Sequence, residues 1–167
     1  MAFVKGRKKF IGDNPNDKVY TPETLARQII SLYNLQGKVL DPFKGGGAFY
    51  NQLPSTTINM WCEIDKGVDF FEFNEKVDWI ISNPPYSIYT EVIKKSMEIA
   101  DNIVYLVPLS KVVSSMGRLR EIHQYGGIVS IHYFSSGRAN FPFGFPSCAI
   151  YIKKNYKGDT TIVELGE

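Results

Sequence analysis

The sequence predicts an α/β protein built on a mostly parallel sheet, with helices on both faces and an antiparallel closing strand. Two observations carry this prediction. Helical and strand patterns alternate along the chain, and the expected strands are nearly continuous apolar runs, as is typical of parallel strands buried on both faces. The last two expected strands, 148–152 and 160–165, have no helix between them, which favours an antiparallel strand near the end.

The expected elements follow one another in order. The segment Thr21-Pro22-Glu23-Thr24 opens a run with helical apolar spacing, which Gly37 is expected to stop. Ser87 is expected to cap a helix that runs to about Ala100. Another helix is expected from about Lys111 to Gln124, ended by Gly126-Gly127. The remaining predictions are strands 38–41, 57–62, 68–71, 77–82, 103–107 and 128–134, a short helical piece at 48–53, and a loop rich in Gly, Pro and Phe at 135–147.

The length and composition bound the kind of protein. The 167 residues suffice for one domain with a substantial core, and 44% apolar with 22% charged residues is ordinary for a soluble globular chain. No apolar run approaches the ~20 residues that span a bilayer. No apolar segment typical of a secretory signal follows the basic start. We therefore expect a cytoplasmic protein with no membrane partner.

The chain divides into a basic arm, 1–19, and a single domain, 20–167. The arm carries Lys5, Arg7, Lys8 and Lys9, which could contact phosphates, although a solvated terminus is the favoured interpretation. The net charge of +2 does not by itself indicate nucleic acid.

The residues that usually hold metals are scattered. Cys62 and Cys148 lie far apart in apolar segments, so we expect buried free thiols. His123 and His132 are isolated and fit no ligand spacing, so both are expected to be structural. The sequence predicts no metal site.

The tetrapeptide Asn83-Pro84-Pro85-Tyr86 is the most informative stretch. It follows the apolar run 77–82, and its two prolines hold the chain rigidly where that strand ends. An amide oxygen and the Pro84 carbonyl could accept two hydrogen bonds from one planar amino group, on whose ring Tyr86 could stack. The alternative is a Pro-rich turn with Tyr86 packed in the core.

The segment Asp41-Pro42-Phe43-Lys44-Gly45-Gly46-Gly47 follows the first expected strand. Its glycines allow a close approach of the backbone to a ligand. Glu63 ends the second strand about twenty residues later, where an acid takes ribose hydroxyls in nucleotide-binding sheets, although alone it could be a solvated strand end. Asp69 and Phe70 could hold an adenine by a hydrogen bond and stacking, or be a surface acid beside a core ring.

Together these motifs resemble a known family. The order Tyr20-Thr21-Pro22, the Asp41–Gly47 segment, Glu63, Asp69-Phe70 and Asn83-Pro84-Pro85-Tyr86 is similar to that of S-adenosylmethionine-dependent amino methyltransferases, most of all adenine-N6 DNA methyltransferases. The resemblance spans residues 20 to about 153. It implies a Rossmann-like class I methyltransferase fold with a seven-stranded sheet, S-adenosyl-L-methionine as cofactor, and a nucleic-acid substrate with DNA favoured over RNA.

The resemblance also implies residue roles. Tyr20, Thr21, Pro22 and Asp41 would hold the methionine end of the cofactor, helped by the backbone of 43–47. Glu63 would bind the ribose. The other implied cofactor contacts are Pro42, Phe43, Gly45, Gly47, Asp69, Phe70 and Asn83.

The target side follows from the same resemblance. Asn83, Pro84, Pro85 and Tyr86 would form the catalytic motif, with Tyr86 stacking on the target base. Phe141 would pack on the flipped base, with Phe143 and Phe145 as rivals and a core role as the alternative.

Two features depart from the family. A small residue is usual at the position of Lys44, which would face solvent or reach a substrate phosphate. The chain also shows little room for a target-recognition domain, so a partner protein could supply recognition, or the substrate could be single-stranded or RNA. Methylation of RNA or of a protein glutamine, and a non-catalytic nucleic-acid-binding partner subunit, remain the alternatives.

Overall fold

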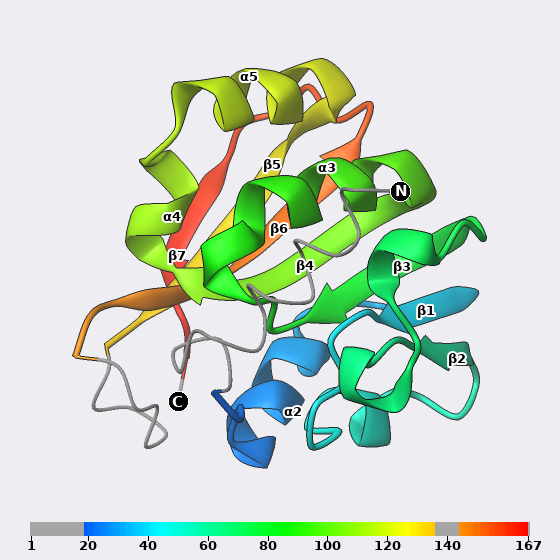
Figure 1. The fold of residues 1–167 in the computed structure, drawn as a ribbon. Helices are drawn as coiled ribbons and strands as arrows, with labels where there is room; N and C mark the ends of the chain where they lie inside the picture. The colour runs from blue at the N-terminus through cyan, green and yellow to red at the C-terminus, as the bar shows by residue number, and fades with distance from the viewer. Residues whose placement is uncertain (1–18, 136–143, 167) are drawn as a thin grey trace.

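The computed structural model describes residues 19–135 and 144–166, and these form one seven-stranded sheet flanked by helices (Figure 1). The expected basic arm, except for its last residue, lies outside the described residues, as do Phe141 and Phe143. The strands are β1 Lys38–Asp41, β2 Ile58–Trp61, β3 Val77–Ser82, β4 Ala100–Pro108, β5 Gly126–Phe134, β6 Ser147–Lys154 and β7 Thr161–Glu164. The α-helices are α2 Glu23–Ser31, α3 Tyr89–Ile99, α4 Leu109–Val113 and α5 Met116–Tyr125, and short 3-10 turns are η2 Tyr50–Gln52, η3 Ile64–Lys66, η4 Phe70–Glu72 and η5 Tyr86–Ile88.

The strand order is β2-β1-β3-β4-β6-β5-β7. β6 runs antiparallel to both of its neighbours, β4 and β5, and the other adjacent pairs are parallel. The predicted mostly parallel sheet with one antiparallel strand is thus confirmed. That strand lies inside the sheet, because β5 and β7, which run in the same direction as β4, lie beyond it.

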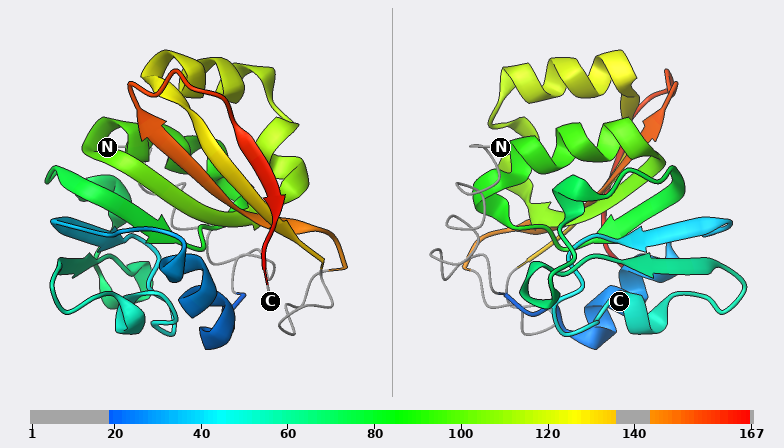
Figure 2. Two further views of the ribbon diagram at one scale, coloured as in Figure 1. Left: turned by 180° about the vertical axis from the view of Figure 1, so that it is seen from behind. Right: turned by 45° about the vertical axis from the view of Figure 1, so that its right-hand side comes forward.

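Helices pack on both faces of the sheet, as expected. α3 buries Val92 and Ile93 in one core cluster, shared with the inward side chains of β3, β4 and β6. α2 buries Leu25 and Ile29 in a second cluster on the opposite face. Figure 2 shows this arrangement, with α3, α4 and α5 on the far side of the sheet in the left-hand view and α2 on the near side. The apolar residues of α2 and α3, which recur at helical spacing, therefore face the sheet, and this explains why these segments fold as helices.

One expected element near the site is wrong in type, and two others differ in detail. Residues 68–71 do not extend the sheet: Val68 makes a single bridge to Glu63, and η4 follows. The reason is local, because the Asp69 carboxylate accepts a hydrogen bond from the Phe71 N–H at 2.9 Å and turns the chain. The helical piece at 48–53 is only the 3-10 turn η2. The expected Ser87 cap of α3 is wrong, because Ser87 lies within η5 and α3 begins at Tyr89 with Ile88 as an N-cap that makes no side-chain hydrogen bond.

The helix expected before Gly126-Gly127 also differs in detail from the prediction. The helix expected at 111–124 is split into α4 and α5, because Ser115 leaves the helical conformation and accepts a hydrogen bond from the Arg118 N–H at 3.3 Å. α5 ends at Tyr125 with Gly126 as its C-cap, as expected, and Gly126-Gly127 also start β5. A Cβ at Gly126 would lie 2.0 Å from the Lys153 carbonyl oxygen, so only glycine allows β6 to approach this closely.

Candidate active site

A cavity of about 280 Å³ opens at the carboxyl ends of β1, β2 and β3. The chain leaves β1 for β2 on one side and later places β3 on the other, so β1 and β3 flank the point where strand order reverses. Open α/β sheets bind ligands at such a point. The cavity is lined by Val19, Tyr20, Pro42, Phe43, Gly45, Glu63, Ile64, Asp65, Lys66, Asp69, Phe70, Phe71, Asn83 and Pro85.

Asp41 organises the turn that follows β1. Its carboxylate is 1% exposed and accepts hydrogen bonds from Ser82 Oγ at 2.6 Å, the Phe43 N–H at 3.3 Å and the Tyr50 N–H at 3.1 Å. Burial raises the pKa of this carboxyl to about 6, although the three hydrogen bonds act in the opposite direction. Asp41 does not line the cavity, so its contacts hold the glycine turn and the end of β3 in place.

The glycine turn is held in a conformation that needs glycine. Gly45 and Gly47 have φ values of +48° and +89°, and the Gly47 N–H donates to the Lys44 carbonyl oxygen at 2.7 Å. The exposed ring of Tyr20 lies close to this turn, because a Cβ at Gly46 would be 3.2 Å from Tyr20 Cδ1. Tyr20 and Gly45 line the cavity, whereas Gly47 lies behind it against Asn51.

Glu63 joins the end of β2 to the glycine turn. Its Oε2 accepts a hydrogen bond from the Gly45 N–H at 2.7 Å, and its Oε1 accepts from the Asp65 N–H at 3.2 Å. Each oxygen keeps a second lone pair. The carboxylate is therefore oriented at the cavity wall and still able to accept hydrogen bonds from a ligand.

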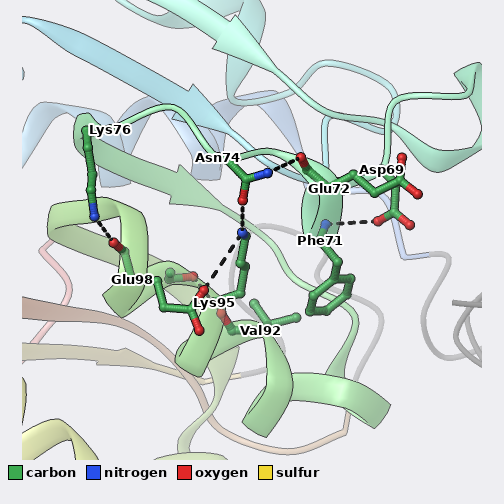
Figure 3. Close-up of polar contacts among 9 residues, drawn as sticks. Asp69, Phe71, Glu72, Asn74, Lys76, Val92, Lys95 and Glu98 are labelled. Atoms are coloured by element: carbon green, nitrogen blue, oxygen red, sulfur yellow. Dashed lines mark hydrogen bonds and ion pairs between the residues drawn. The ribbon is translucent and has the colours of Figure 1, made fainter. Parts of the chain in front are cut away.

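Aromatic rings form the wall beyond Glu63. Phe70 is buried, and its ring contacts that of Phe43 edge to face at 5.2 Å. Asp69 stands beside them, with one oxygen accepting the Phe71 N–H (Figure 3). A planar ring with a hydrogen-bond donor at its edge fits this combination of flat apolar surface and carboxylate.

Figure 3 also shows how this wall is supported from α3. Lys95 Nζ donates to Asn74 Oδ1 at 2.9 Å, and Lys76 donates to the Glu98 carbonyl oxygen. These contacts hold the segment after η4 against the helix that follows the Pro-Pro motif.

Asn83 faces the cavity from the end of β3 with its amide orientation fixed. Its Nδ2 donates to the Val19 carbonyl oxygen at 3.3 Å and to Thr21 Oγ1 at 3.1 Å. Because a backbone carbonyl only accepts, the atom that faces Val19 must be the nitrogen. The Asn83 Oδ1 is then buried with no hydrogen-bond partner among the described residues. An unpaired buried acceptor costs about 1–3 kcal/mol, which a ligand that donates to it would recover.

Several expected site residues lie outside the cavity lining. Thr21 and Pro22 stand behind it, Thr21 as the partner of Asn83 and Pro22 at the start of α2. Pro84 is buried, and Tyr86 is 8% exposed within the core cluster that includes α3. The Lys44 ammonium lies over two aromatic rings instead of the cavity. Phe145, a rival of Phe141, is 39% exposed, and Phe141 itself is outside the described residues.

Five lining residues were not expected from the sequence: Val19, Ile64, Asp65, Lys66 and Phe71. Three of them form η3, directly after Glu63 at the end of β2. Their place at a strand end was the available signal, since loops at the carboxyl edge line the sites of such sheets.

Other expected features lie away from the cavity. Cys62 and Cys148 are buried free thiols, as predicted, and burial raises the pKa of each to about 12. His132, on β5, contacts the ring of Tyr33, and burial lowers the pKa of His132. The described residues contain no group of three or more His, Cys, Asp or Glu side chains arranged for a metal ion. Within 19–135 and 144–166, every helix is too short or too polar to cross a membrane.

The sequence matches no protein-family model and no curated protein. Solved structures with a similar fold include methyltransferases. One is a methyltransferase subunit of a type I restriction-modification system from Streptococcus thermophilus, with a TM-score of 0.70 and 15% identity over 93% of this chain and 49% of the subunit. The chain thus spans about half the length of that subunit.

Two other similar structures are covered over more of their length. A provisionally assigned class I S-adenosylmethionine-dependent methyltransferase from Listeria monocytogenes has a TM-score of 0.70 and 14% identity, over 99% of this chain and 71% of that one. A provisionally assigned RNA methyltransferase from Pyrococcus horikoshii has a TM-score of 0.66 and 19% identity, over 85% and 91%. At these identities the similarity concerns the fold, and the chain has the Rossmann-like fold of class I methyltransferases.

Proposed function

We propose that this chain binds S-adenosyl-L-methionine in the cavity and transfers its methyl group to an exocyclic amino group of a nucleic acid, with adenine N6 in DNA as the favoured target. The proposal rests on Asn83 Oδ1, which is buried beside a cavity at the strand-order reversal and has no hydrogen-bond partner in the part of the chain that the structure describes. The methyltransferase fold and the motif order of the sequence agree with it.

The cavity residues fit the parts of this cofactor. The Glu63 carboxylate, fixed by the Gly45 N–H, suits two ribose hydroxyls. Asp69 and the rings of Phe43 and Phe70 suit the adenine. The glycine turn and Tyr20 would hold the methionine end, with Asp41, Thr21 and Pro22 supporting them from behind.

The chemistry proposed for the protein is positioning and electrostatic stabilisation. The bound sulfonium supplies an activated methyl group. An exocyclic amine is a poor nucleophile because its lone pair is conjugated with the ring, so two acceptors aimed at its hydrogens favour attack. Asn83 Oδ1 and the Pro84 carbonyl would be these acceptors, held by the Val19 and Thr21 contacts of the amide and by the rigid Pro84-Pro85 pair.

Tyr86 and Phe141 remain proposed contacts of the target base. The low exposure of the Tyr86 ring means that stacking on a base requires the ring or its surroundings to move. Tyr86→Ala therefore tests whether this ring serves the core or the target.

The experiment is transfer of labelled methyl from the cofactor to separate DNA, RNA and protein pools. Asn83→Ala is expected to lower transfer by about 100-fold or more, since the target amine loses one of its acceptors. Asn59→Ala, an amide on β2 outside the cavity lining, is the matched control and should keep full activity. Unchanged transfer by Asn83→Ala would refute the role of the amide.

The substrate pool decides between the candidates. RNA is the second candidate, because one similar structure is provisionally assigned as an RNA methyltransferase. Label that enters only RNA, or only protein, would exclude the DNA assignment. Cofactor binding without transfer to any pool would favour a non-catalytic subunit that depends on a partner protein, a case raised by the similarity to a restriction-modification subunit.

A further inference from the structure

The ammonium group of Lys44 is held between two aromatic rings. Its Nζ lies 4.4 Å from the centre of the Tyr50 ring and 4.6 Å from the centre of the Trp61 ring. A cation over the face of an aromatic ring is attracted by the electron density of that face, and tryptophan gives the strongest such contact. Lys44 does not line the cavity, so its positive charge interacts with these two rings.

The two rings come from different parts of the site. Tyr50 begins η2, and its N–H donates to Asp41 at 3.1 Å. Trp61 ends β2, directly opposite Asp41 in the parallel pairing of β1 and β2. The Lys44 side chain therefore ties the glycine turn both to η2 and to the end of β2.

Glu63 depends on the same turn for its orientation. The Gly45 N–H, one residue after Lys44, holds Glu63 Oε2 at 2.7 Å, and the Lys44 N–H donates to the Cys62 carbonyl oxygen at 3.0 Å. Gly45 has a φ of +48°, in a turn whose successive glycines have wide backbone freedom. Something must restrict that freedom if the Gly45 N–H is to hold a carboxylate in one place.

We propose that Lys44 is a positioning residue for cofactor recognition: the two ring contacts of its ammonium fix the glycine turn so that the Gly45 N–H orients Glu63 toward the ribose. The inference rests on the proposed function, and it gives Lys44 a different role from the phosphate contact expected from the sequence. Lys44 acts through Glu63 and touches neither the cofactor nor the target.

The test measures S-adenosylhomocysteine affinity by calorimetry for wild type, Lys44→Met, Lys44→Arg, Glu63→Gln and the double variant Lys44→Met/Glu63→Gln. Lys44→Met keeps an unbranched apolar side chain and removes the cation, and should weaken binding by about five- to thirtyfold, the equivalent of two ring contacts. Lys44→Arg retains a cation over both rings and should restore affinity. Lys94→Met, on the surface of α3, is the control for loss of a positive charge.

The double variant separates positioning from a general loss of structure. If Lys44 acts through Glu63, the double variant binds no more weakly than Glu63→Gln alone. Additive losses, or wild-type affinity of Lys44→Met, would overturn the inference. Should Lys44→Met fail to fold, Trp61→Leu removes one ring and must show the same dependence on Glu63. Absence of binding by the wild-type protein would instead contradict the proposed function itself.

Discussion

Asp41 carries a buried carboxylate at the start of the glycine turn. Burial raises its pKa from 3.8 to about 6, because the cost of burying charge exceeds the gain from Ser82 and two backbone N–H groups. The native state therefore binds a proton at Asp41 more tightly than the unfolded chain does. The part of the stability that comes from this proton is full below pH 4 and is lost as the pH rises through 6.

We predict that this carboxyl lowers the free energy of unfolding by up to about 3 kcal/mol between pH 4 and pH 7. The measurement is urea denaturation of wild type and Asp41→Asn across that range. As pH rises, the free energy of unfolding of Asp41→Asn should increase relative to that of wild type. The amide loses one hydrogen bond at every pH, because its nitrogen must face a backbone N–H donor. A difference that does not change with pH would contradict the assignment of the shift to Asp41.

At the level of residues, the sequence predicted several side chains that line the cavity, while the roles proposed for them stay predictions. Glu63, Asp69, Phe70 and Asn83 were expected at strand ends, and all four line one cavity. Asp41 was expected to contact the cofactor. It lies behind the turn instead, because its carboxylate accepts hydrogen bonds from Ser82 and from two backbone N–H groups. Whether a side chain points into a cavity or into the protein interior depends on its rotamer and on contacts with residues distant in sequence. The spacing of residues along the chain does not encode either.

The elements show the same division between pattern and local detail. β3 was predicted with both ends correct, because an apolar run ended by two prolines has little ambiguity. β4 begins three residues earlier than expected, since α3 passes into it at Ala100 without a breaker residue. The strand expected at 68–71 failed because the Asp69 side chain turns the chain, and a single side-chain hydrogen bond is invisible to periodicity.

Replacing glycine by alanine should have opposite effects on stability in the glycine turn and in α5. Gly47→Ala should destabilise the protein by about 1–2 kcal/mol, because the φ of +89° strains an L residue and its Cβ would lie 2.6 Å from Asn51 Nδ2. Gly117→Ala, in the first turn of α5 with only an ordinary contact at 3.9 Å, should stabilise by up to about 1 kcal/mol. Urea denaturation of both variants checks the pair. Equal effects of the two substitutions would show that the turn does not require glycine.

For the molecule as a whole, alternation of helices and strands was enough to predict the sheet and its two covered faces. The order of the strands was not predicted, because pairing is set by crossovers between distant segments, which periodicity does not encode. The split between α4 and α5 was missed. It places Arg118 where it can join three helices, and this contact is visible only once α3, α4 and α5 lie on one face of the sheet.

Arg118 is 5% exposed and is the polar link among those helices. Its guanidinium donates to Thr90 Oγ1 in α3 at 3.1 Å, to the Lys111 carbonyl oxygen in α4, and to Ser114 Oγ at 3.2 Å. It also lies over the Tyr89 ring, 5.0 Å from the ring centre. One planar group thus satisfies acceptors from α3, from α4 and from the turn between α4 and α5, which a single ammonium could not do.

Arg118→Met should therefore lower the free energy of unfolding by about 2–4 kcal/mol, because charge-assisted hydrogen bonds are lost and their acceptors are left in a poorly hydrated place. Arg118→Lys should recover little, since it lacks the fork geometry. Arg120→Met, an exposed position on the same helix, is the control and should change stability by less than about 0.5 kcal/mol. If Arg118→Met and Arg120→Met unfold at the same urea concentration, the three helices are held to the sheet by their apolar contacts alone.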